Sequence, residues 1–185
     1  GKFIALGGQW KYWIQDSNTP KIGSYQATYQ PFGSLRVRFP KGQTEDYSRR
    51  LDLEKGLVSI NYKQSDVSYS RQYFASYPDN VIMARYEASK PGKLSFALQM
   101  ASKHQDCRIW KVDAGTLGME VEVKNGALEG TAFVTVKVDG GRMIERDGEL
   151  HIENANSADI YLTGATNFQN YQQVDTRSAY RVQAE

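Results

Sequence analysis

Hydrophobic and polar residues alternate along most of the chain, which is the pattern of half-buried β-strands. The clearest example places Leu94, Phe96, Leu98 and Met100 on one face of a single segment. Residues 81–86 are largely apolar without alternation, as is typical of a strand that is covered on both faces. Because the spacing of two persists, the sequence predicts strands and no helix longer than about two turns. Further alternating runs lie at 35–39, 58–62, 67–73, 119–123, 131–138, 150–152 and 160–162.

Turn-forming residues separate these runs at intervals of about eight to twelve residues. Strands at this spacing without helices predict an all-β fold, either a sandwich or a barrel. Periodicity is weak at 102–118, which is therefore predicted to be a long loop between two strands. The strongest turn signals are Asn125-Gly126, Gly140-Gly141 and Asp147-Gly148, with a short hairpin loop at 64–66.

Composition places the chain among folded globular proteins. Of its 185 residues, 40% are hydrophobic and 24% are charged, which suits one domain with a sizeable core. The net charge of +2 is too small to argue for a nucleic acid or an anionic membrane as the partner. A single cysteine, Cys107, excludes an internal disulfide and a cysteine-based metal cluster, and we expect no metal ion and no cofactor.

The titratable residues form no recognisable catalytic arrangement. His104 lies in the predicted loop and His151 on the polar face of a strand, and neither has metal-ligand partners at a known spacing. Hydrolysis of a glycoside needs two carboxylates at a fixed separation, and the acidic residues instead flank turns, where side chains are usually solvated. We therefore predict no catalytic residue in this chain. The carboxylates beside turns are Glu45, Asp46, Asp52, Glu54, Glu145, Asp147 and Glu149.

Three tryptophans are the best candidates for a binding site. Trp10, Trp13 and Trp110 lie in irregular stretches rather than in clean alternating runs. An exposed indole offers a flat apolar face that suits the CH-rich face of a sugar ring, so these residues are candidate carbohydrate-binding positions. The alternative is that they fill the ends of a sandwich or cover an interface with another domain.

Several short motifs together resemble the N-terminal β-sandwich domain of glycoside hydrolase family 95, the α-L-fucosidase family. The resemblance covers roughly residues 29–170. It implies an antiparallel β-sandwich of the supersandwich type over 29–185, preceded by an arm or edge segment at 1–28. The earlier strands of that family's sandwich have no counterpart here, so we expect an incomplete domain. The matching motifs are Tyr29-Gln30-Pro31-Phe32-Gly33 with the run after it, 46–53, 69–79 with Val81-Ile82 and, more weakly, Gly140-Gly141, 147–150 and 165–168.

The same resemblance implies an inverting glycosidase whose acid and base lie in a separate (α/α)6 barrel. This chain would then be a non-catalytic domain that supports the barrel of an α-L-fucosidase or α-L-galactosidase acting on plant or host glycans. A periplasmic or extracellular location follows from the same comparison. The expected partners are the enzyme's own catalytic domain and its glycan substrate, and the chain alone is expected to be inactive.

Two other functions stay open, an independent carbohydrate-binding module and a free-standing enzyme. The module would use the three tryptophans and would bind glycans without a catalytic domain. The free-standing enzyme lacks an acid–base pair in the sequence. A domain taken from a larger enzyme would also expose aromatic side chains and self-associate. The aromatics expected to be exposed, besides the tryptophans, are Phe168, Tyr171 and Tyr180.

Overall fold

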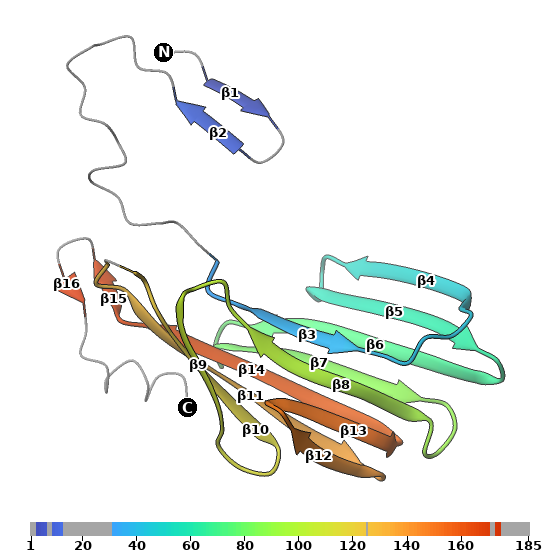
Figure 1. The fold of residues 1–185 in the computed structure, drawn as a ribbon. Helices are drawn as coiled ribbons and strands as arrows, with labels where there is room; N and C mark the ends of the chain where they lie inside the picture. Colours follow the sequence, from blue (N-terminus) through green and yellow to red (C-terminus); the bar gives the residue numbers. More distant parts are fainter. Residues whose placement is uncertain (1–2, 7–8, 13–30, 125, 171–172, 175–185) are drawn as a thin grey trace, which may run out of the picture.

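Two antiparallel sheets pack face to face and enclose the hydrophobic core (Figure 1). The computed structural model describes residues 3–6, 9–12, 31–124, 126–170 and 173–174, and every regular element in these ranges is a strand. The predicted all-β antiparallel sandwich is therefore confirmed. No helix long and apolar enough to span a membrane occurs in the described ranges.

The larger sheet has eight strands, and a strand from late in the chain joins its two halves. That strand is β14 (Ser157–Thr166), which pairs with an early strand on one side and a middle strand on the other. In their order across the sheet the strands are β4 (Glu45–Asp52), β5 (Leu57–Gln64), β6 (Val67–Ser76), β7 (Val81–Ala88), β14, β11 (Glu129–Asp139), β10 (Thr116–Glu122) and β9 (Asp106–Lys111).

The smaller sheet has four strands and covers only part of the larger one (Figure 1). Two separate hairpins are also described, one of them within the segment 1–28 that was expected to be an arm or an edge. The order across the smaller sheet is β12 (Arg142–Arg146), β13 (Glu149–Ala155), β8 (Leu94–Ala101) and β3 (Ser34–Arg38). The hairpins are β1 (Phe3–Leu6) with β2 (Gln9–Tyr12) and β15 (Phe168–Asn170) with β16 (Gln173–Val174).

Strand β8 supplies the centre of the core. Its residues Leu94, Phe96, Leu98 and Met100 alternate toward the larger sheet and are at most 4% exposed, as their spacing predicts. Truncating such a buried residue to alanine lowers the free energy of unfolding by about 2–5 kcal/mol. The side chains of this strand therefore determine how the two sheets pack against each other. The larger sheet meets it with fully buried side chains that include Leu117, Val134 and Ile160.

Two hairpin turns adopt the geometry that their sequences favour. Gly140 and Gly141 have φ angles of 69° and 65°, and Asp147 and Gly148 have φ angles of 53° and 75°. Two consecutive residues in the left-handed region are the mark of a type I′ turn, whose twist matches that of the flanking strands. Gly141 is required for a second reason, because a Cβ there would lie 2.3 Å from the backbone oxygen of Glu153.

The prediction of a long loop at 102–118 is wrong. Strand β9 occupies residues 106–111 and pairs with β10, with Trp110 opposite Gly118. Because β9 is an edge strand and most of its residues are exposed, its sequence lacks the alternation by which strands are recognised. Of the predicted turn that follows β10, Asn125 lies outside the described residues.

The β4–β5 end of the larger sheet extends beyond the smaller sheet (Figure 1). The alternating run at 58–62 predicts that Val58, Ile60 and Tyr62 share the buried face of β5. Only Tyr62 is fully buried, at 7% exposure, while the other two are half-buried. The four-stranded sheet is too small to cover the whole eight-stranded sheet. The face of β5 that turns inward was therefore predicted correctly, and its degree of burial was not. Of the polar residues on the opposite face, Asn61 and Lys63 are exposed as expected, whereas Ser59 is half-buried.

Candidate functional site

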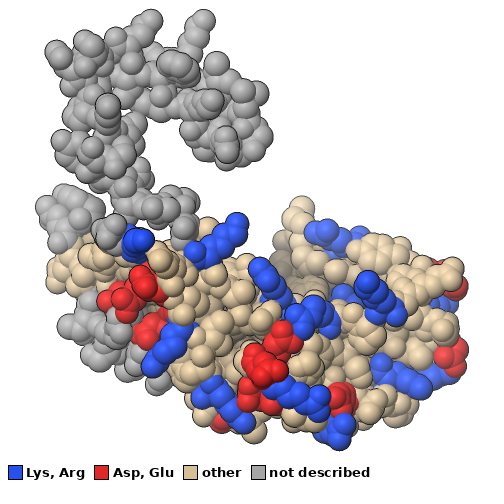
Figure 2. Space-filling model, in the orientation of Figure 1, with Lys and Arg blue, Asp and Glu red and all other residues tan. Residues whose placement is uncertain are grey.

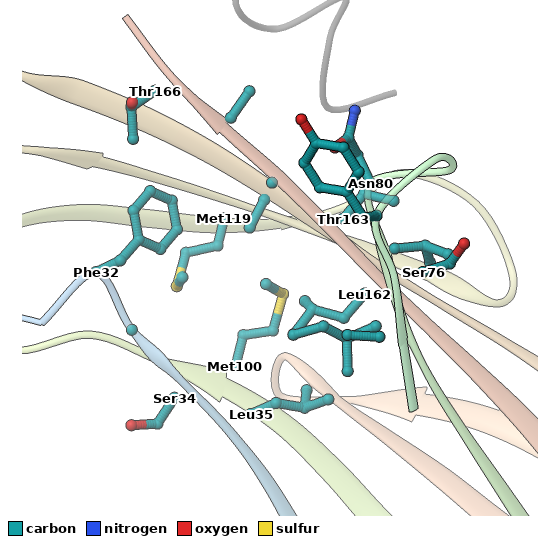
Figure 3. A pocket seen from close by; sticks show the side chains of 18 residues that line it. Phe32, Ser34, Leu35, Ser76, Asn80, Met100, Met119, Leu162, Thr163 and Thr166 are labelled. Atoms are coloured by element: carbon teal, nitrogen blue, oxygen red, sulfur yellow. The ribbon is translucent and has the colours of Figure 1, made fainter. Parts of the chain in front are cut away.

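An apolar groove of about 650 Å³ opens between the two sheets, at the end where β6 turns into β7. Its walls come from the start of β3, the β6–β7 hairpin and the ends of β8 and β14. Figure 3 shows the side chains of Phe32, Leu35, Met100, Met119 and Leu162 around this shared space. The flexible thioethers of the two methionines adapt to irregular apolar partners better than branched side chains do.

The motif Pro31-Phe32-Gly33, which precedes β3, forms one rim of the groove. The ring of Phe32 packs against β11, and the Ser102 hydroxyl donates a hydrogen bond to the Phe32 carbonyl oxygen at 2.7 Å. Gly33 leaves room for Met119, because a Cβ at Gly33 would lie 2.5 Å from the Met119 methyl carbon. The motif therefore sets both the width of the groove and the position of a methionine inside it.

The polar atoms of the groove belong to neutral side chains. The polar residues of its lining, most of them labelled in Figure 3, are Ser34, Ser76, Tyr77, Asn80, Thr163 and Thr166. Its described lining holds no carboxylate, histidine, lysine or arginine. A group that could donate or accept a proton near neutral pH is therefore missing from this lining, and the groove suits an apolar segment rather than a hydrolytic reaction.

Exposed apolar side chains continue from the groove onto the surface. Tyr77 is 92% exposed and Ile82 is 52% exposed, and both line the groove. A contiguous apolar surface of this kind on a folded domain usually marks a contact with another protein segment. The groove and these two side chains are the candidate functional site.

Two partly buried carboxylates among the described residues contact basic side chains. Glu149 contacts Arg38, and the Asp159 carboxylate lies 3.1 Å from the Arg85 guanidinium. Figure 2 shows basic and acidic side chains interspersed over the face in view. No group of three or more metal-ligating side chains occurs among the described residues.

The two histidines and the cysteine each have different surroundings. His104 is 9% exposed in the segment before β9, and its backbone N–H donates to Ser102 Oγ at 3.2 Å. His151 is half-buried on β13, with its Nε2 3.6 Å from Glu149 Oε2. Burial raises the pKa of the Cys107 thiol, so this residue is not an activated nucleophile at neutral pH.

Trp110 lies on the outer face of the larger sheet, on the edge strand β9. Its ring covers Gly118, where a Cβ would lie 2.4 Å from the ring, and it meets Phe133 edge-on at 5.9 Å between ring centroids. Trp10 belongs to β2 and its side chain lies outside the described residues, as does all of Trp13. Of the three candidate tryptophans only the Trp110 side chain is therefore among the described residues, and their role in carbohydrate binding stays a prediction.

The sequence analysis missed the groove itself. Met100 and Met119 were recognised from their alternation as core residues, and that pattern cannot show that a core is open at one end. The available signal was Pro31-Phe32-Gly33, in which an aromatic residue and a glycine come just before a strand. In the sequence this motif indicated only a family resemblance and not a groove.

A family model described as the N-terminal domain of glycosyl hydrolase family 65 matches residues 11–171, which is most of the chain. The chain belongs to this family. Its membership confirms the coarser part of the sequence analysis, a glycoside hydrolase N-terminal domain. The match names family 65 where the motifs resembled family 95, and family 95 itself is not confirmed.

Two curated relatives of this glycosyl hydrolase N-terminal domain are named as fucosidases. Alpha-L-fucosidase 2 of Arabidopsis thaliana is 29% identical over 174 residues, covering 79% of this chain and 20% of the relative. A protein of Aspergillus niger assigned as alpha-fucosidase A is 28% identical over 95 residues, covering 47% of this chain and 12% of the relative. The chain thus spans at most about a fifth of the length of these relatives.

A solved structure from the human microbiome, assigned as a kojibiose phosphorylase, shares the fold. The two structures superpose with a TM-score of 0.50 at 14% sequence identity, over 81% of this chain and 24% of the other. At this identity the similarity concerns the fold alone.

Proposed function

We propose that this chain is the non-catalytic N-terminal domain of a longer α-L-fucosidase-type glycoside hydrolase, and that its apolar groove receives part of the enzyme's catalytic domain. The observation that carries the proposal is the groove, which is open and apolar and whose described lining has no acid or base. A hydrolytic site needs two carboxyl groups, whereas an interface needs apolar area. The family membership and the fucosidase relatives support this assignment.

The proposal commits the groove to one occupant, the remainder of the same polypeptide. Four-fifths of the Arabidopsis relative lie outside the part that this chain matches, which is ample protein to cover one end of the sandwich. Domain interfaces within a chain typically bury about 600–1,500 Å², and an apolar groove with Tyr77 and Ile82 at its edge can supply part of such an area. The substrate class is a terminal α-L-fucose or α-L-galactose on plant or host glycans, which is met in the periplasm or outside the cell.

The test compares this chain with the full-length product of its gene. We expect the full-length protein to release nitrophenol from a 4-nitrophenyl α-L-fucoside and the chain alone to release none. Activity of the pure chain that is abolished by changing one of its carboxylates would contradict the proposal, as would a full-length product that ends near Glu185.

A matched pair of variants tests the interface. Ile82 is 52% exposed at the groove and Leu128 is 41% exposed away from it. In the full-length protein, Ile82→Lys should lower the melting temperature and Leu128→Lys should not, because only the first places a charge in a covered apolar contact. In the chain alone both should be nearly silent. Equal effects of the two variants in the full-length protein would exclude the groove as the interface.

A carbohydrate-binding module is the second candidate function, and one observation favours it. The outer face of the larger sheet carries a second hollow, of about 430 Å³, with the rings of Phe133 and Tyr161 and the hydroxyls of Thr135 and Thr163 in its lining. Aromatic rings beside hydroxyls suit a neutral sugar. Calorimetry of the chain with fucosylated and galactosylated oligosaccharides tests this function, and binding that Tyr161→Ala abolishes would support it.

A further inference from the structure

The side chain of Arg71 lies on the inner face of β6 among aromatic rings, without a carboxylate partner in the described residues. Its guanidinium carbon is 3.6 Å from the centre of the Phe39 ring and 4.8 Å from that of Tyr62. The Nη2 group donates to the Tyr62 hydroxyl. The Nε atom is buried and has no hydrogen-bond partner. Arg71 is thus a cation with one of its donors unused.

An unpaired guanidinium in this position is costly. Leaving a buried donor unsatisfied costs about 1–3 kcal/mol, and more for a charged group. The stacking of the guanidinium on Phe39 and Tyr62 offsets part of this free-energy cost, since a cation over an aromatic face gains about 0.5–2 kcal/mol. A carboxylate is the ligand that satisfies a guanidinium best, through short charge-assisted hydrogen bonds. Arg71 is only half-buried and lines a pocket, so an anion that enters the pocket would meet a guanidinium that has no carboxylate partner among the described residues.

Arg71 forms part of a pocket of about 430 Å³ beneath the β3–β4 connection. The other polar groups of its lining are the hydroxyl of Thr44, the phenols of Tyr47 and Tyr62 and the amide of Gln64. The residue Tyr47 is 60% exposed, so its ring is accessible to a ligand. Ligand sites of about 300–1,000 Å³ are common, and an aromatic ring beside neutral donors is the usual lining of a sugar site.

The charge around the pocket is positive. Arg49 is directly opposite Ile60 on the neighbouring strand, and Ile60 is directly opposite Arg71, so both arginines occupy one face of the sheet. Strands are about 4.8 Å apart, which places the two arginine backbones about 10 Å from each other. The carboxylate of Asp46, which precedes Tyr47, is engaged by Lys63 at 2.7 Å. The pocket therefore attracts anions.

We propose that this pocket binds a uronate, a sugar unit that carries a carboxylate. The Arg71 guanidinium would bind the carboxylate, the sugar ring would pack on Tyr47, and Thr44 and Gln64 would bond to its hydroxyls. The proposal rests on the proposed function to the extent that a glycan-acting enzyme meets acidic glycans. It adds a second class of sugar, which this chain itself would recognise.

The experiment is a titration of this chain with sodium D-glucuronate, with D-glucose and sodium acetate as the other probes, followed by NMR of the amide and arginine Nε–H signals. We expect glucuronate to shift the signals of Arg71 and Tyr47 with a dissociation constant in the millimolar range, and glucose to shift neither. Arg71→Gln should weaken the binding of glucuronate by about tenfold or more, since a charge-assisted pair is lost.

Two further variants keep the test decisive if Arg71→Gln perturbs the fold. Tyr47→Ala changes an exposed side chain and should also weaken the binding of glucuronate, whereas Arg36→Gln, on the exposed side of β3, should leave it unchanged. No shift with glucuronate, or equal shifts with glucose, would overturn the proposal. Acetate binding as tightly as glucuronate would overturn its sugar part. None of these results depends on hydrolysis by the full-length protein, so the two proposals fail separately.

Discussion

The ring of Phe32 lies directly on Gly130: a Cβ built on Gly130 would come within 2.1 Å of the Phe32 Cε2 atom. This contact joins the segment before β3 to the middle of the larger sheet and closes one side of the apolar groove. Gly130 has to be glycine because a larger residue would clash with Phe32. Adding one methyl group at this position would therefore displace Phe32 and change the width of the groove.

Gly130→Ala should therefore destabilise the protein, by about 1–3 kcal/mol, because the added methyl group forces the Phe32 ring out of place. Gly164→Ala is the matched control. It lies on the neighbouring strand β14, and its Cβ would meet the nearest atom at an ordinary 3.5 Å. Urea unfolding of both variants measures the difference, and equal midpoints would show that Phe32 moves away without cost.

Ile60→Asp should lower the free energy of unfolding by about 1–3 kcal/mol, because it places a carboxylate on the half-buried inner face of β5. Asn61→Asp makes a comparable change on the exposed face of the same strand and should be nearly silent. Thermal unfolding followed by circular dichroism checks both. Equal melting temperatures for the two variants would contradict the register of β5.

Glu153 should gain protons more readily when Arg142 is removed. The Arg142 Nε atom lies 2.7 Å from Glu153 Oε2 and holds the pKa of that carboxyl below its ordinary 4.5. A lowered folded-state pKa adds stability above the unfolded pKa, and that stability is lost as the pH falls through the folded value. In Arg142→Gln, an NMR titration should show the pKa of Glu153 moving up toward 4.5. Arg146→Gln, a weaker neighbour, should move it less.

The chain alone should self-associate through the groove, because Tyr77 and Ile82 are exposed apolar side chains. Sedimentation velocity at several concentrations should show a sedimentation coefficient that rises with concentration. Ile82→Lys should reduce this rise, and Leu128→Lys should not. A single monomeric species at high concentration would contradict the prediction. Tyr171 and Tyr180, also expected to be exposed, lie outside the described residues.

The fold was largely predictable because strands such as β8 are more buried on one face than on the other. Apolar residues therefore recur at every second position of the sequence. The strand β9 was missed because an edge strand is exposed on both faces and needs no such pattern. The site was less predictable. That Trp110 covers Gly118, or that Arg71 sits among rings, depends on cross-strand register, which no local pattern contains.

The position of β14 constrains how the protein is made. The Arg85 guanidinium on β7 lies 3.1 Å from the Asp159 carboxylate on β14, 74 residues later in the chain. Until β14 leaves the ribosome, β7 has no hydrogen-bonding neighbour on the side opposite β6. The four strands from β4 to β7 then form a partial sheet whose edge strand, β7, is unpaired. Contacts this distant in sequence slow folding. The chain between the two strands must give up conformational entropy to bring them together before their hydrogen bonds can form. During synthesis the early half of the larger sheet therefore exposes an unpaired strand edge, which is the kind of surface that pairs with other chains.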